Sequence, residues 1–468
     1  MSLVRDLCES LDAEGVGYCH WKSTAFLERS ATAENDLDLL VDRADASRLG
    51  LILHRLGFKE ARDPRTAPGV ADFYGYDSDA DRFVHVHVHY QLVVGDDATK
   101  NYRLPIEDAF LASATSQGIF RVPSPELELV AFVIRMVLKH ATWDALLTRQ
   151  GRLPDRARQE LEYLRAAADQ DRLGSLLRAH LPSLGVTLFA DCVRALTPGC
   201  GVWRRVRTGH RLLVRLKPYT RRPRFLDIGL KLWRRGVSFL ARRLSRTPKL
   251  GAQLVSGGAM IAVVGGDGAG KSTAVGQLEA WLSRDFRARR IHLGRPPQSA
   301  ATFLIRTALK ARMRLARGRG RYPKILRVLL DLAIARDRRS AYSDARRFAN
   351  RGGLVICDRF PLRDVPSIDG PRLPGRLGAH EGKLPRLLLA IEQRYFAGLA
   401  PPDVLIALLV DPDIAVERRP DERPDFVRQR CEEFSRVAWG SMRAHVIDAG
   451  RPPSEVLAVV KRSVWSSL

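Results

Sequence analysis

The spacing of apolar and polar residues changes along the chain and divides it into segments. Residues 126–180 place apolar side chains at helical spacing, as in ELELVAFVIRMVLKHA, which predicts a group of packed helices. From residue 259 onward, apolar runs such as MIAVVG, GLVICD and DVLIALLV alternate with helical stretches. That alternation is typical of a parallel sheet covered by helices. Residues 1–125 read as shorter strands and helices, so we expect an α/β protein with an α+β N-terminal part.

Domain boundaries follow from the same pattern. Residues 1–125 form one predicted domain and residues 126–200 its helical extension. Residues 201–257 are rich in arginine and are interrupted by three prolines, so they are predicted to be a basic connector that ends in the SGG turn. Residues 258–468 then form the C-terminal domain.

Composition limits the class of protein. The chain has 468 residues, enough for two or three domains, and 45% of them are hydrophobic, so each domain can bury a core. No apolar run reaches the roughly 18 residues that a membrane-spanning helix needs. The N-terminus MSLVRDLCESLDAEG has no apolar stretch of the secretory type. The six cysteines never form a CxxC pair, which favours reduced thiols and a cytoplasmic protein.

Positive charge is concentrated in two segments. The net charge is +25; residues 203–249 hold 16 Arg and Lys against one acid, and residues 304–351 hold 15 against three. Charge gathered in this way indicates an acidic partner, which is a phosphorylated substrate, an anionic membrane surface or nucleic acid.

The stretch VVGGDGAGKST, residues 263–273, contains the phosphate-binding motif G-x-x-x-x-G-K-[ST]. It follows an apolar strand and opens a helical pattern, which is the context that makes the motif specific. Glycines allow backbone N–H groups to surround a phosphate, and the helix N-terminus adds a favourable dipole. Lys271 would bridge the β- and γ-phosphates of ATP, and the Ser272 hydroxyl would hold Mg²⁺. The expected nucleotide-binding residues are Gly265, Asp267, Gly268, Gly270, Lys271, Ser272 and Thr273.

Residues 259–468 resemble the thymidylate kinases and the wider nucleoside-monophosphate kinase group. The loop GGDGAGKST is close to that family's GxDGAGKST, and ARDRRSAYSDARRFANRGGLVICDRF is similar to its A-D-R … R-G … V-I-x-D-R-Y. PPDVLIALLVDPDIAVERR resembles the strand before the lid of these kinases, and VIDAGRPPSEVLAVV resembles their last strand and helix. The resemblance implies a P-loop kinase that uses ATP and Mg²⁺ and forms a dimer.

Three residues outside the loop are candidates for the kinase chemistry. Phosphoryl transfer requires positioning and charge neutralisation more than it requires a nucleophile. Asp358, at the end of a buried strand, suits the Mg²⁺ shell. The resemblance implies that Arg359 orients the acceptor or the transferring group and that Arg338 contacts the acceptor phosphate. Surface ion pairing is the alternative for both arginines.

A second set of arginines follows from Gly268. Some relatives carry an arginine at this place in the loop, and those with glycine resemble the class that supplies a catalytic arginine from a lid. The corresponding segment here is VERRPDERPDFVRQR, residues 416–430, which we call the lid segment. Arg418 and Arg419 are the catalytic candidates, with Arg423 as a third.

The acceptor side departs from the thymidylate kinases. Val264 stands where the family has Glu, IHLGRPPQ replaces its R-E-P-G stretch, and PLRDVPSIDGPRLPGR replaces the helix after its Asp-Arg pair. We therefore expect the acceptor to be a nucleoside monophosphate, a sugar or a sugar phosphate. The resemblance of the whole chain to fusions of such a kinase with a nucleotidyltransferase-like domain implies a pathway of activated sugars or surface polysaccharide. Authentic dTMP kinase activity is the alternative.

Residues 20–60 resemble the minimal nucleotidyltransferase fold. A Lys22–Ser23 turn precedes an Asp-Leu-Asp strand, and a helix and an L-G-F turn follow. Asp36 and Asp38 fall on one face of that strand, where two carboxylates could hold Mg²⁺. The third carboxylate of this fold should lie on the next long strand.

That next strand is FVHVHVHYQL, residues 83–92, in which His87 stands where the third carboxylate is expected. The valines would form its packed face, and His85, His87 and His89 would face Asp36 and Asp38. Imidazole is a poor ligand for Mg²⁺ and a good one for Zn²⁺, Mn²⁺ or Fe²⁺. Three interpretations stay open: a degenerate or binding-only site, an altered transition-metal site at Asp36, Asp38 and His87, or a solvated face.

The basic segments add candidate partners. Residues 224–246 predict a basic amphipathic helix that lies on an anionic membrane at its inner face or packs against the kinase domain. Residues 304–327 lie between kinase strands, where their charge would select an acidic acceptor of small-molecule or glycan type. Nucleic acid is not the expected partner. Two other functions remain open: a nucleotidyltransferase with an ATP-sensing P-loop domain, and a regulatory scaffold that binds ATP and a membrane.

Overall fold

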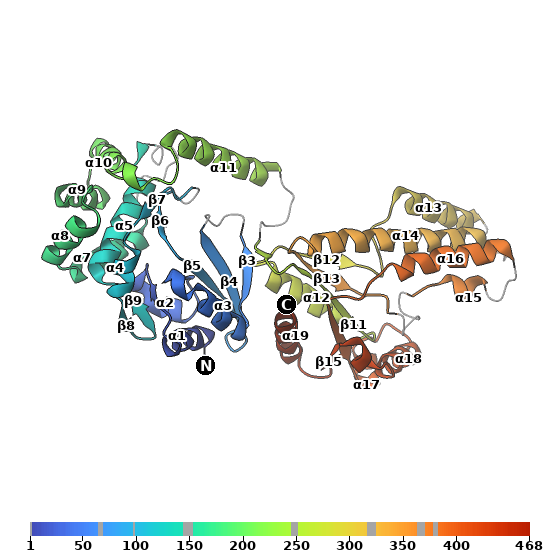
Figure 1. Cartoon of the computed structure of the whole chain (residues 1–468). Helices are drawn as coiled ribbons and strands as arrows, with labels where there is room; N and C mark the ends of the chain where they lie inside the picture. Colours follow the sequence, from blue (N-terminus) through green and yellow to red (C-terminus); the bar gives the residue numbers. More distant parts are fainter. Residues whose placement is uncertain are drawn as a thin grey trace. The chain divides into compact units, whose positions relative to one another are not determined.

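The computed structural model of the chain describes residues 2–63, 69–96, 99–143, 153–244, 251–315, 324–362, 370–377 and 382–468. These residues form two compact units, Met1–Pro248 and Lys249–Leu468, which run from blue to green and from yellow to red in Figure 1. We call them the N-terminal and C-terminal units. Residues 245–250 of the predicted connector, 316–323 of the basic segment and 363–369 of the acceptor stretch lie outside the described residues.

The N-terminal unit is built on a mixed sheet with the strand order β1-β2-β5-β4-β3. Strands β2 and β5 pair in parallel, and the other neighbouring pairs are antiparallel. The strands are β1 (Tyr18–His20), β2 (Leu37–Val41), β3 (Lys59–Arg62), β4 (Val70–Asp77) and β5 (Arg82–His89). Two further antiparallel pairs are β6 (Leu92–Val94) with β7 (Tyr102–Leu104) and β8 (Thr115–Gln117) with β9 (Phe120–Val122).

The alternation along β5 decides which face of this sheet is buried. Val84, Val86 and Val88 are 0% exposed and pack in a core with the helices α1 (Leu3–Ala13) and α3 (Ala46–Arg55). The intervening histidines therefore lie on the opposite face, because successive side chains of a strand point to opposite sides. This is the arrangement that the alternating pattern predicts.

A helical layer completes the N-terminal unit. Its helices are α2 (Leu27–Ala31), α4 (Glu107–Ala112), α5 (Pro125–His140), α7 (Asp155–Ala167), α8 (Gln170–His180), α9 (Val186–Leu196), α10 (Val202–Arg215) and α11 (Arg224–Leu244). Helix α5 begins at Pro125 after the N-cap Ser124, whose hydroxyl accepts from the Leu127 N–H, and it is buried along most of its length.

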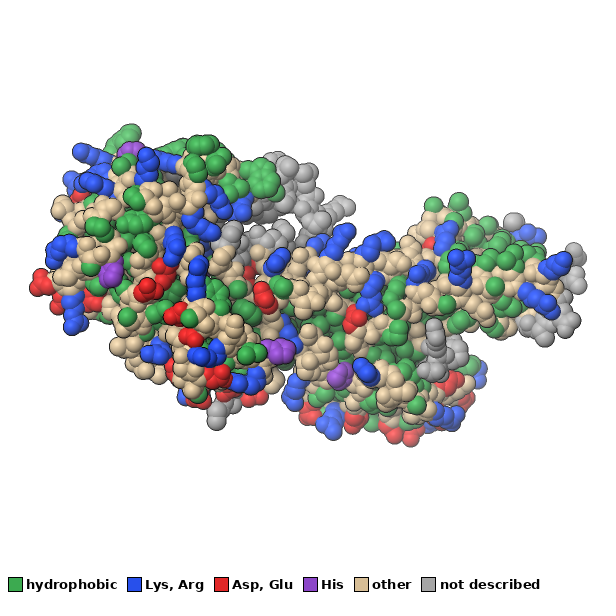
Figure 2. All heavy atoms as spheres, in the orientation of Figure 1, with side chains coloured by type: hydrophobic (Ala, Val, Ile, Leu, Met, Phe, Trp, Pro, Cys, Tyr) green, Lys and Arg blue, Asp and Glu red, His purple; other side chains and the backbone are tan. Residues whose placement is uncertain are grey.

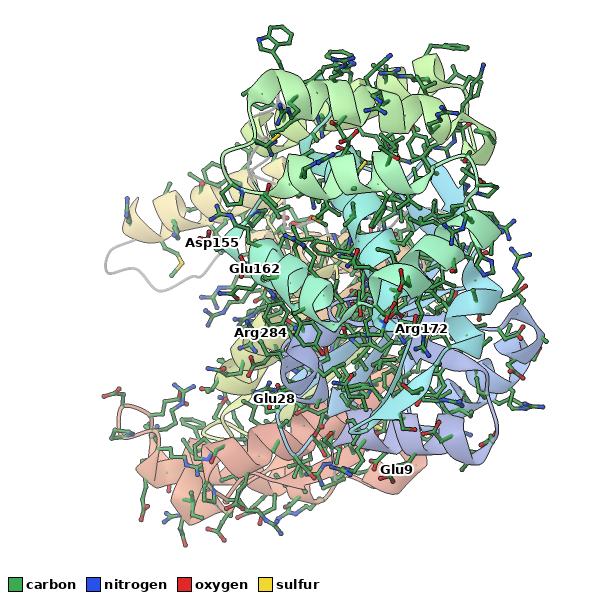
Figure 3. The ribbon with its side chains drawn as sticks, turned by 90° about the vertical axis from the view of Figure 1, so that its left-hand side faces the viewer. Glu9, Glu28, Asp155, Glu162, Arg172 and Arg284 are labelled. Atoms are coloured by element: carbon green, nitrogen blue, oxygen red, sulfur yellow. The ribbon has the colours of Figure 1, made fainter. Side chains whose placement is uncertain are left out.

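The helices that surround α5 are amphipathic. In α7, Leu161 and Leu164 are buried in the hydrophobic core around α5, whereas Asp155 and Glu162 are exposed. Figure 3 labels Asp155 and Glu162 on α7 and Arg172 on α8, on the outer side of this layer. Leu212 and Leu216 at the end of α10 belong to the same core, so the first part of the predicted connector packs with the N-terminal unit.

The C-terminal unit is a parallel sheet with helices on both faces. The strand order is β12-β13-β11-β14-β15, with every neighbouring pair parallel. The strands are β11 (Ala259–Gly265), β12 (Ala288–His292), β13 (Leu354–Asp358), β14 (Val404–Leu409) and β15 (His445–Asp448), preceded by the short β10 (Gln253–Leu254). The α/β fold class that the sequence predicts is therefore confirmed for this unit.

Both faces of this sheet are apolar. Its helices are α12 (Lys271–Leu282), α13 (Ala300–Leu315), α14 (Lys324–Ala349), α15 (Leu373–Leu377), α16 (Lys383–Ala397), α17 (Pro412–Glu417), α18 (Pro424–Ser435) and α19 (Pro453–Ser467). Met260 and Ala262 of β11 pack with Tyr342 and Ala345 of α14. Helices α12 and α19 pack together through Trp281 and Trp465 (Figure 1). Among the described helices, none combines the length and apolarity needed to cross a membrane.

Candidate functional site

The phosphate-binding loop lies after β11, the central strand of the C-terminal sheet. Gly268 and Gly270 adopt φ angles of 78° and 77°, which favour glycine. A Cβ at Gly268 would lie 2.8 Å from the carbonyl oxygen of Ala415 in α17, so the loop has no room for a side chain there. Helix α12 begins at Lys271, and its first-turn N–H groups face the end of the sheet where ligands of open α/β sheets bind.

Lys271 is held against the loop. Its Nζ donates to the carbonyl oxygen of Gly266 at 2.5 Å and lies 3.8 Å from Oδ1 of Asp267. Burial lowers the pKa of Lys271 to about 8, although the Asp267 carboxylate opposes this shift. Ser272 and Thr273, in the first turn of α12, are exposed.

The predicted strand-end residues lie beside this loop. Asp358 is the last residue of β13, in register with Val263 of β11, and it forms an ion pair with Arg290 of β12. Arg359 adopts a left-handed φ of 61° and places Nη2 3.8 Å from Oδ1 of Asp267. Non-glycine residues in this region carry about 1–3 kcal/mol of strain and occur often at functional sites.

Arg338 is buried and contacts the strand ends from α14. It is 2% exposed, its Nε donates to the carbonyl oxygen of Leu293 at 2.7 Å, and its guanidinium lies over the ring of Phe396. The neighbouring Asp337 accepts from the backbone N–H of Ser299 at 3.0 Å and from Thr302 Oγ1 at 2.6 Å. Asp337 therefore holds the start of α13.

The lid segment places its arginines differently. Arg418 Nη1 donates to the carbonyl oxygen of Ala449 at 2.9 Å and lines a cavity of about 500 Å³ beside the loop. Arg419 lies close enough to Lys271 to lower the pKa of that ammonium. The Arg423 side chain is 74% exposed and contacts Asp425 and the ring of Phe426.

Two arginines that the motif comparison did not single out contact the site. Arg430 of α18 forms an ion pair with Asp267, and Arg290 forms one with Asp358. Burial alone would raise the pKa of Asp267, but the hydrogen bond from Arg430 and the charge of Lys271 hold it below its ordinary value. For Arg430, the only sequence signal of a functional role is that it belongs to the lid segment. Arg290 lies in an ordinary strand pattern, which gives no such signal.

The cavity beside the loop has a mixed wall. It is formed by the loop and α12, the end of β14, Arg418 and the start of α19. Its lining residues are Gly268, Ala269, Gly270, Thr273, Ala274, Gln277, Leu408, Arg418, Ala449, Arg451, Pro453, Ser454, Val456 and Leu457. A cavity with apolar surface beside a phosphate-binding loop can hold the non-phosphate part of a nucleotide.

A second polar cluster lies on the face of the N-terminal sheet opposite the valine core. Asp38 Oδ1 accepts from Lys22 Nζ at 2.6 Å, from His87 Nδ1 at 3.2 Å and from His89 Nε2 at 3.3 Å. These contacts hold the pKa of Asp38 well below its ordinary value against the opposing effect of burial. The turn residue Lys22 thus supplies a positive charge at a carboxylate that was expected to bind Mg²⁺.

Asp36, His85 and His87 form the outer part of this cluster, and Asp72 lies beneath them. Asp36 Oδ1 is 3.1 Å from His85 Nδ1. Asp72 Oδ1 is 3.3 Å from His85 Nε2 and 3.2 Å from His87 Nε2. Sequence reasoning expected a third carboxylate on β5 and missed Asp72, which lies on β4 directly opposite His87.

Comparison with known proteins gives partial matches. No protein-family profile matches the chain. The chain is 26% identical over 220 residues to the uncharacterized ATP-binding protein YghR of Escherichia coli, covering 44% of this chain and 86% of that protein. It is 23% identical over 228 residues to the uncharacterized ATP-binding protein YghS of the same organism, covering 45% and 93%. Among solved structures, a thymidylate kinase from Candida albicans matches with a TM-score of 0.30 and 17% identity over 44% of this chain and 91% of that chain.

Proposed function

We propose that the C-terminal unit is an ATP- and Mg²⁺-dependent phosphotransferase of the P-loop kinase type. The observation that carries the proposal is the convergence at the end of β11, where a glycine loop, the partly buried Lys271 and a cavity of about 500 Å³ adjoin one another. The similarity to two Escherichia coli proteins named as ATP-binding supports the choice of nucleotide.

The nucleoside of ATP would occupy the cavity. Ala274, Val456 and Leu457 offer apolar surface for a base, and the loop N–H groups at the adjoining end face the phosphates. Arg418 closes the wall through its hydrogen bond to Ala449, so we assign it to nucleotide binding.

The residues present suit a magnesium ion. Ser272 offers an exposed hydroxyl in the first turn of α12, and Asp358 offers a carboxylate on the adjacent strand end. Oxygen ligands of this kind, together with phosphate oxygens, are those that Mg²⁺ prefers. When bound, the ion would neutralise charge on the β- and γ-phosphates.

The remaining positive charges favour transfer of a phosphoryl group. Lys271, Arg359 and Arg430 each contact Asp267, and Arg419 lies within electrostatic reach of Lys271. Phosphoryl transfer proceeds by neutralising charge on the transferring group, so cations fixed around the loop are what the reaction requires. We assign Arg419 and Arg359 to this role and Arg338 to positioning of the acceptor side.

The acceptor is proposed to be a nucleoside monophosphate, a sugar or a sugar phosphate. The test is ADP formation by the full chain with ATP, Mg²⁺ and a panel of these compounds, dTMP included. We expect one chemical class to raise ADP formation well above the rate without acceptor. ADP formation that no member of the panel stimulates would contradict the proposed acceptor class.

The pKa of Lys271 gives a pH dependence of ATP binding. Bound phosphates require the protonated ammonium, and in the free protein that group has a pKa of about 8. Affinity is therefore expected to be constant below pH 8 and to fall as pH rises above it, approaching about tenfold per pH unit. Equilibrium titration with ATP at pH 7, 8 and 9 measures this.

Lys271→Arg is the matched control for the pH series, because a guanidinium stays charged throughout this range. The variant is expected to bind ATP more weakly and without the decline above pH 8. Equal dissociation constants for the wild type at pH 7 and pH 9 would contradict the assignment of Lys271.

We also propose that the outer face of α11 binds an anionic membrane surface. Its inner side is polar: Lys231 Nζ and Arg235 Nη2 lie 3.7 and 2.6 Å from Oδ2 of the buried Asp96. Its outer side carries Phe225, Trp233 and Phe239, which are 73%, 65% and 61% exposed. A helix held by ion pairs and with its apolar side exposed has the polarity expected at a lipid interface.

The charge around this face supports an anionic membrane as the partner. Residues 203–249 hold 16 Arg and Lys against one acid, and Figure 2 shows hydrophobic and basic side chains together over α10 and α11. Basic residues that surround exposed aromatic side chains match the anionic headgroups and the boundary of a bilayer.

Trp233→Glu is expected to abolish co-sedimentation with vesicles of one-third phosphatidylserine, because it places a negative charge in the apolar face. Leu51→Glu, at a side chain 70% exposed on α3, is the matched control and should bind as the wild type does. Equal binding to neutral vesicles would remove the electrostatic part of the proposal. A Trp233→Glu variant that dissociates a dimer instead would identify the face as a self-association surface.

A further inference from the structure

The polar cluster on the N-terminal sheet extends over three adjacent strands. Asp38 lies on β2 and Asp36 directly before it, His85, His87 and His89 lie on β5, and Asp72 lies on β4. The register places Asp38 opposite His87 on one side and Asp72 opposite His87 on the other. The side chains therefore form a continuous row across the sheet, on the face opposite the valine core.

The cluster separates into an inner and an outer part. In the inner part, the Asp38 carboxylate receives Lys22, His87 and His89, and both Asp38 and His89 are buried. The Asp38 carboxylate contacts the side chains of these three residues, and the Lys22 ammonium is the closest of them. Asp38 thus fixes the ring of His87 through Nδ1 and directs Nε2 toward Asp72, whose Oδ1 lies 3.2 Å away.

The outer part has the donor set of a metal site. Asp36, His85 and His87 each offer a ligand atom within 4.8 Å of the others. Asp72 adds a 2% exposed carboxylate whose Oδ1 lies 3.3 and 3.2 Å from the Nε2 atoms of His85 and His87. Neighbouring ligand atoms around tetrahedral zinc are about 3.3 Å apart, because the bonds are roughly 2.0–2.1 Å long.

The carboxylates of the cluster outnumber its fixed cation. Asp36, Asp38 and Asp72 together carry three negative charges, and Lys22 supplies one positive charge against them. Without a metal, protons on His85 and His87 match the other two, because hydrogen bonds to the carboxylates raise the pKa of both imidazoles against the opposing effect of burial. One divalent cation carries the same charge and would replace these two protons.

We propose that Asp36, His85 and His87 bind one divalent transition-metal ion, with the Asp72 carboxylate beside the two imidazoles. Two imidazole nitrogens and a carboxylate oxygen suit Zn²⁺, Mn²⁺ or Fe²⁺, whereas Mg²⁺ prefers oxygen ligands alone. Asp38 acts behind the ligands: its hydrogen bond to His87 Nδ1 orients that ring, as carboxylates behind metal-bound histidines do. The Asp36 side chain is 54% exposed, so the ion has a path from solvent.

This site differs from one in which paired carboxylates hold Mg²⁺. In a two-carboxylate Mg²⁺ site, Asp36 and Asp38 would both face the ion. In this protein Lys22 contacts Asp38 at 2.6 Å, and the histidines lie between the carboxylates. The proposal is independent of the kinase function assigned to the C-terminal unit.

The test is calorimetric titration of the metal-free full chain with ZnCl₂, followed by Co²⁺ substitution and its visible absorption spectrum. We expect one ion per wild-type chain at this site and a Co²⁺ spectrum of a low-coordinate site. His85→Ala and His87→Ala are expected to weaken that binding by about 100-fold or more. His54→Ala, at an exposed histidine of α3, is the matched control and should bind as the wild type does.

A second variant keeps the test valid if the histidine variants do not fold. Asp36→Asn alters an exposed side chain, so its metal-free melting temperature should equal that of the wild type while Zn²⁺ binding falls about tenfold or more. Zn²⁺ should also raise the melting temperature of the wild type and not that of the folded His87→Ala variant. Equal Zn²⁺ affinity in the wild type, His85→Ala, His87→Ala and Asp36→Asn would show that the cluster is an ion-pair network only.

Discussion

Lys271→Ala is expected to lower ATP turnover by about 10²–10³-fold and to weaken ATP binding, because it removes a positive charge fixed beside the transferring phosphate. The side chain already lies in the loop, with Nζ 2.5 Å from the Gly266 carbonyl oxygen, so phosphate binding exchanges one oxygen partner for another. The measurement is steady-state ADP formation with the best acceptor of the panel, together with equilibrium binding of ATP.

Stability distinguishes loss of chemistry from loss of fold in this variant. Burial lowers the pKa of Lys271, which means that the folded protein disfavours its charged form. The alanine variant should therefore melt at the wild-type temperature or above it. Lys383→Ala, at an exposed lysine of α16, is the matched control. Turnover in Lys271→Ala equal to that of the control would contradict the P-loop assignment.

The lid arginines are expected to give three different kinetic results. Arg419→Ala should lower kcat by about 10³-fold or more with little change in KM for ATP, because a cation that acts on the transferring group contributes mainly in the transition state. Arg418→Ala should mainly raise KM for ATP, since Arg418 lines the proposed nucleoside cavity. Arg423→Ala should leave both constants unchanged, because its side chain is 74% exposed.

Comparison of these three variants tests the position of the lid segment. The three substituted positions lie within a few residues of one another, and each variant loses the same type of side chain. A general effect of lost positive charge should therefore be equal in all three. A kcat reduction shared by all three would indicate a nonspecific effect of charge. Wild-type turnover in Arg419→Ala would exclude that residue as the catalytic arginine, and the same result in all three would remove the lid hypothesis.

Much of the C-terminal unit follows from local sequence patterns. The loop 263–273 lies between an apolar run and a helical pattern. Each of these patterns can be recognised from the residues of its own segment alone. Asp358 ends a strand of buried residues, as its position after GLVIC predicts. What the patterns could not supply are contacts across strands and between distant helices, such as those of Arg290 with Asp358 and of Arg430 with Asp267.

The N-terminal cluster shows the same limit. The alternation in FVHVHVHYQL predicts which side chains share a face, because strand geometry requires it. Asp72 could not be placed in this way, since its position depends on an antiparallel register between β4 and β5 that no local pattern specifies. Likewise, the prolines and arginines of residues 201–257 indicate a connector, but the burial of Leu212 and Leu216 results from packing against α5 and α9.

The central claim is that ATP is used by the C-terminal unit as a donor of its γ-phosphoryl group. The most direct measurement follows ATP labelled at the α or at the γ position in the full chain, in Lys271→Ala and in Asp36→Ala/Asp38→Ala. We predict that the γ label moves to the acceptor in the wild type and in the double aspartate variant but not in Lys271→Ala. Transfer of the α label, lost on replacement of Asp36 and Asp38, would contradict the claim and indicate nucleotidyl transfer; transfer of neither label would indicate a protein that only binds ATP.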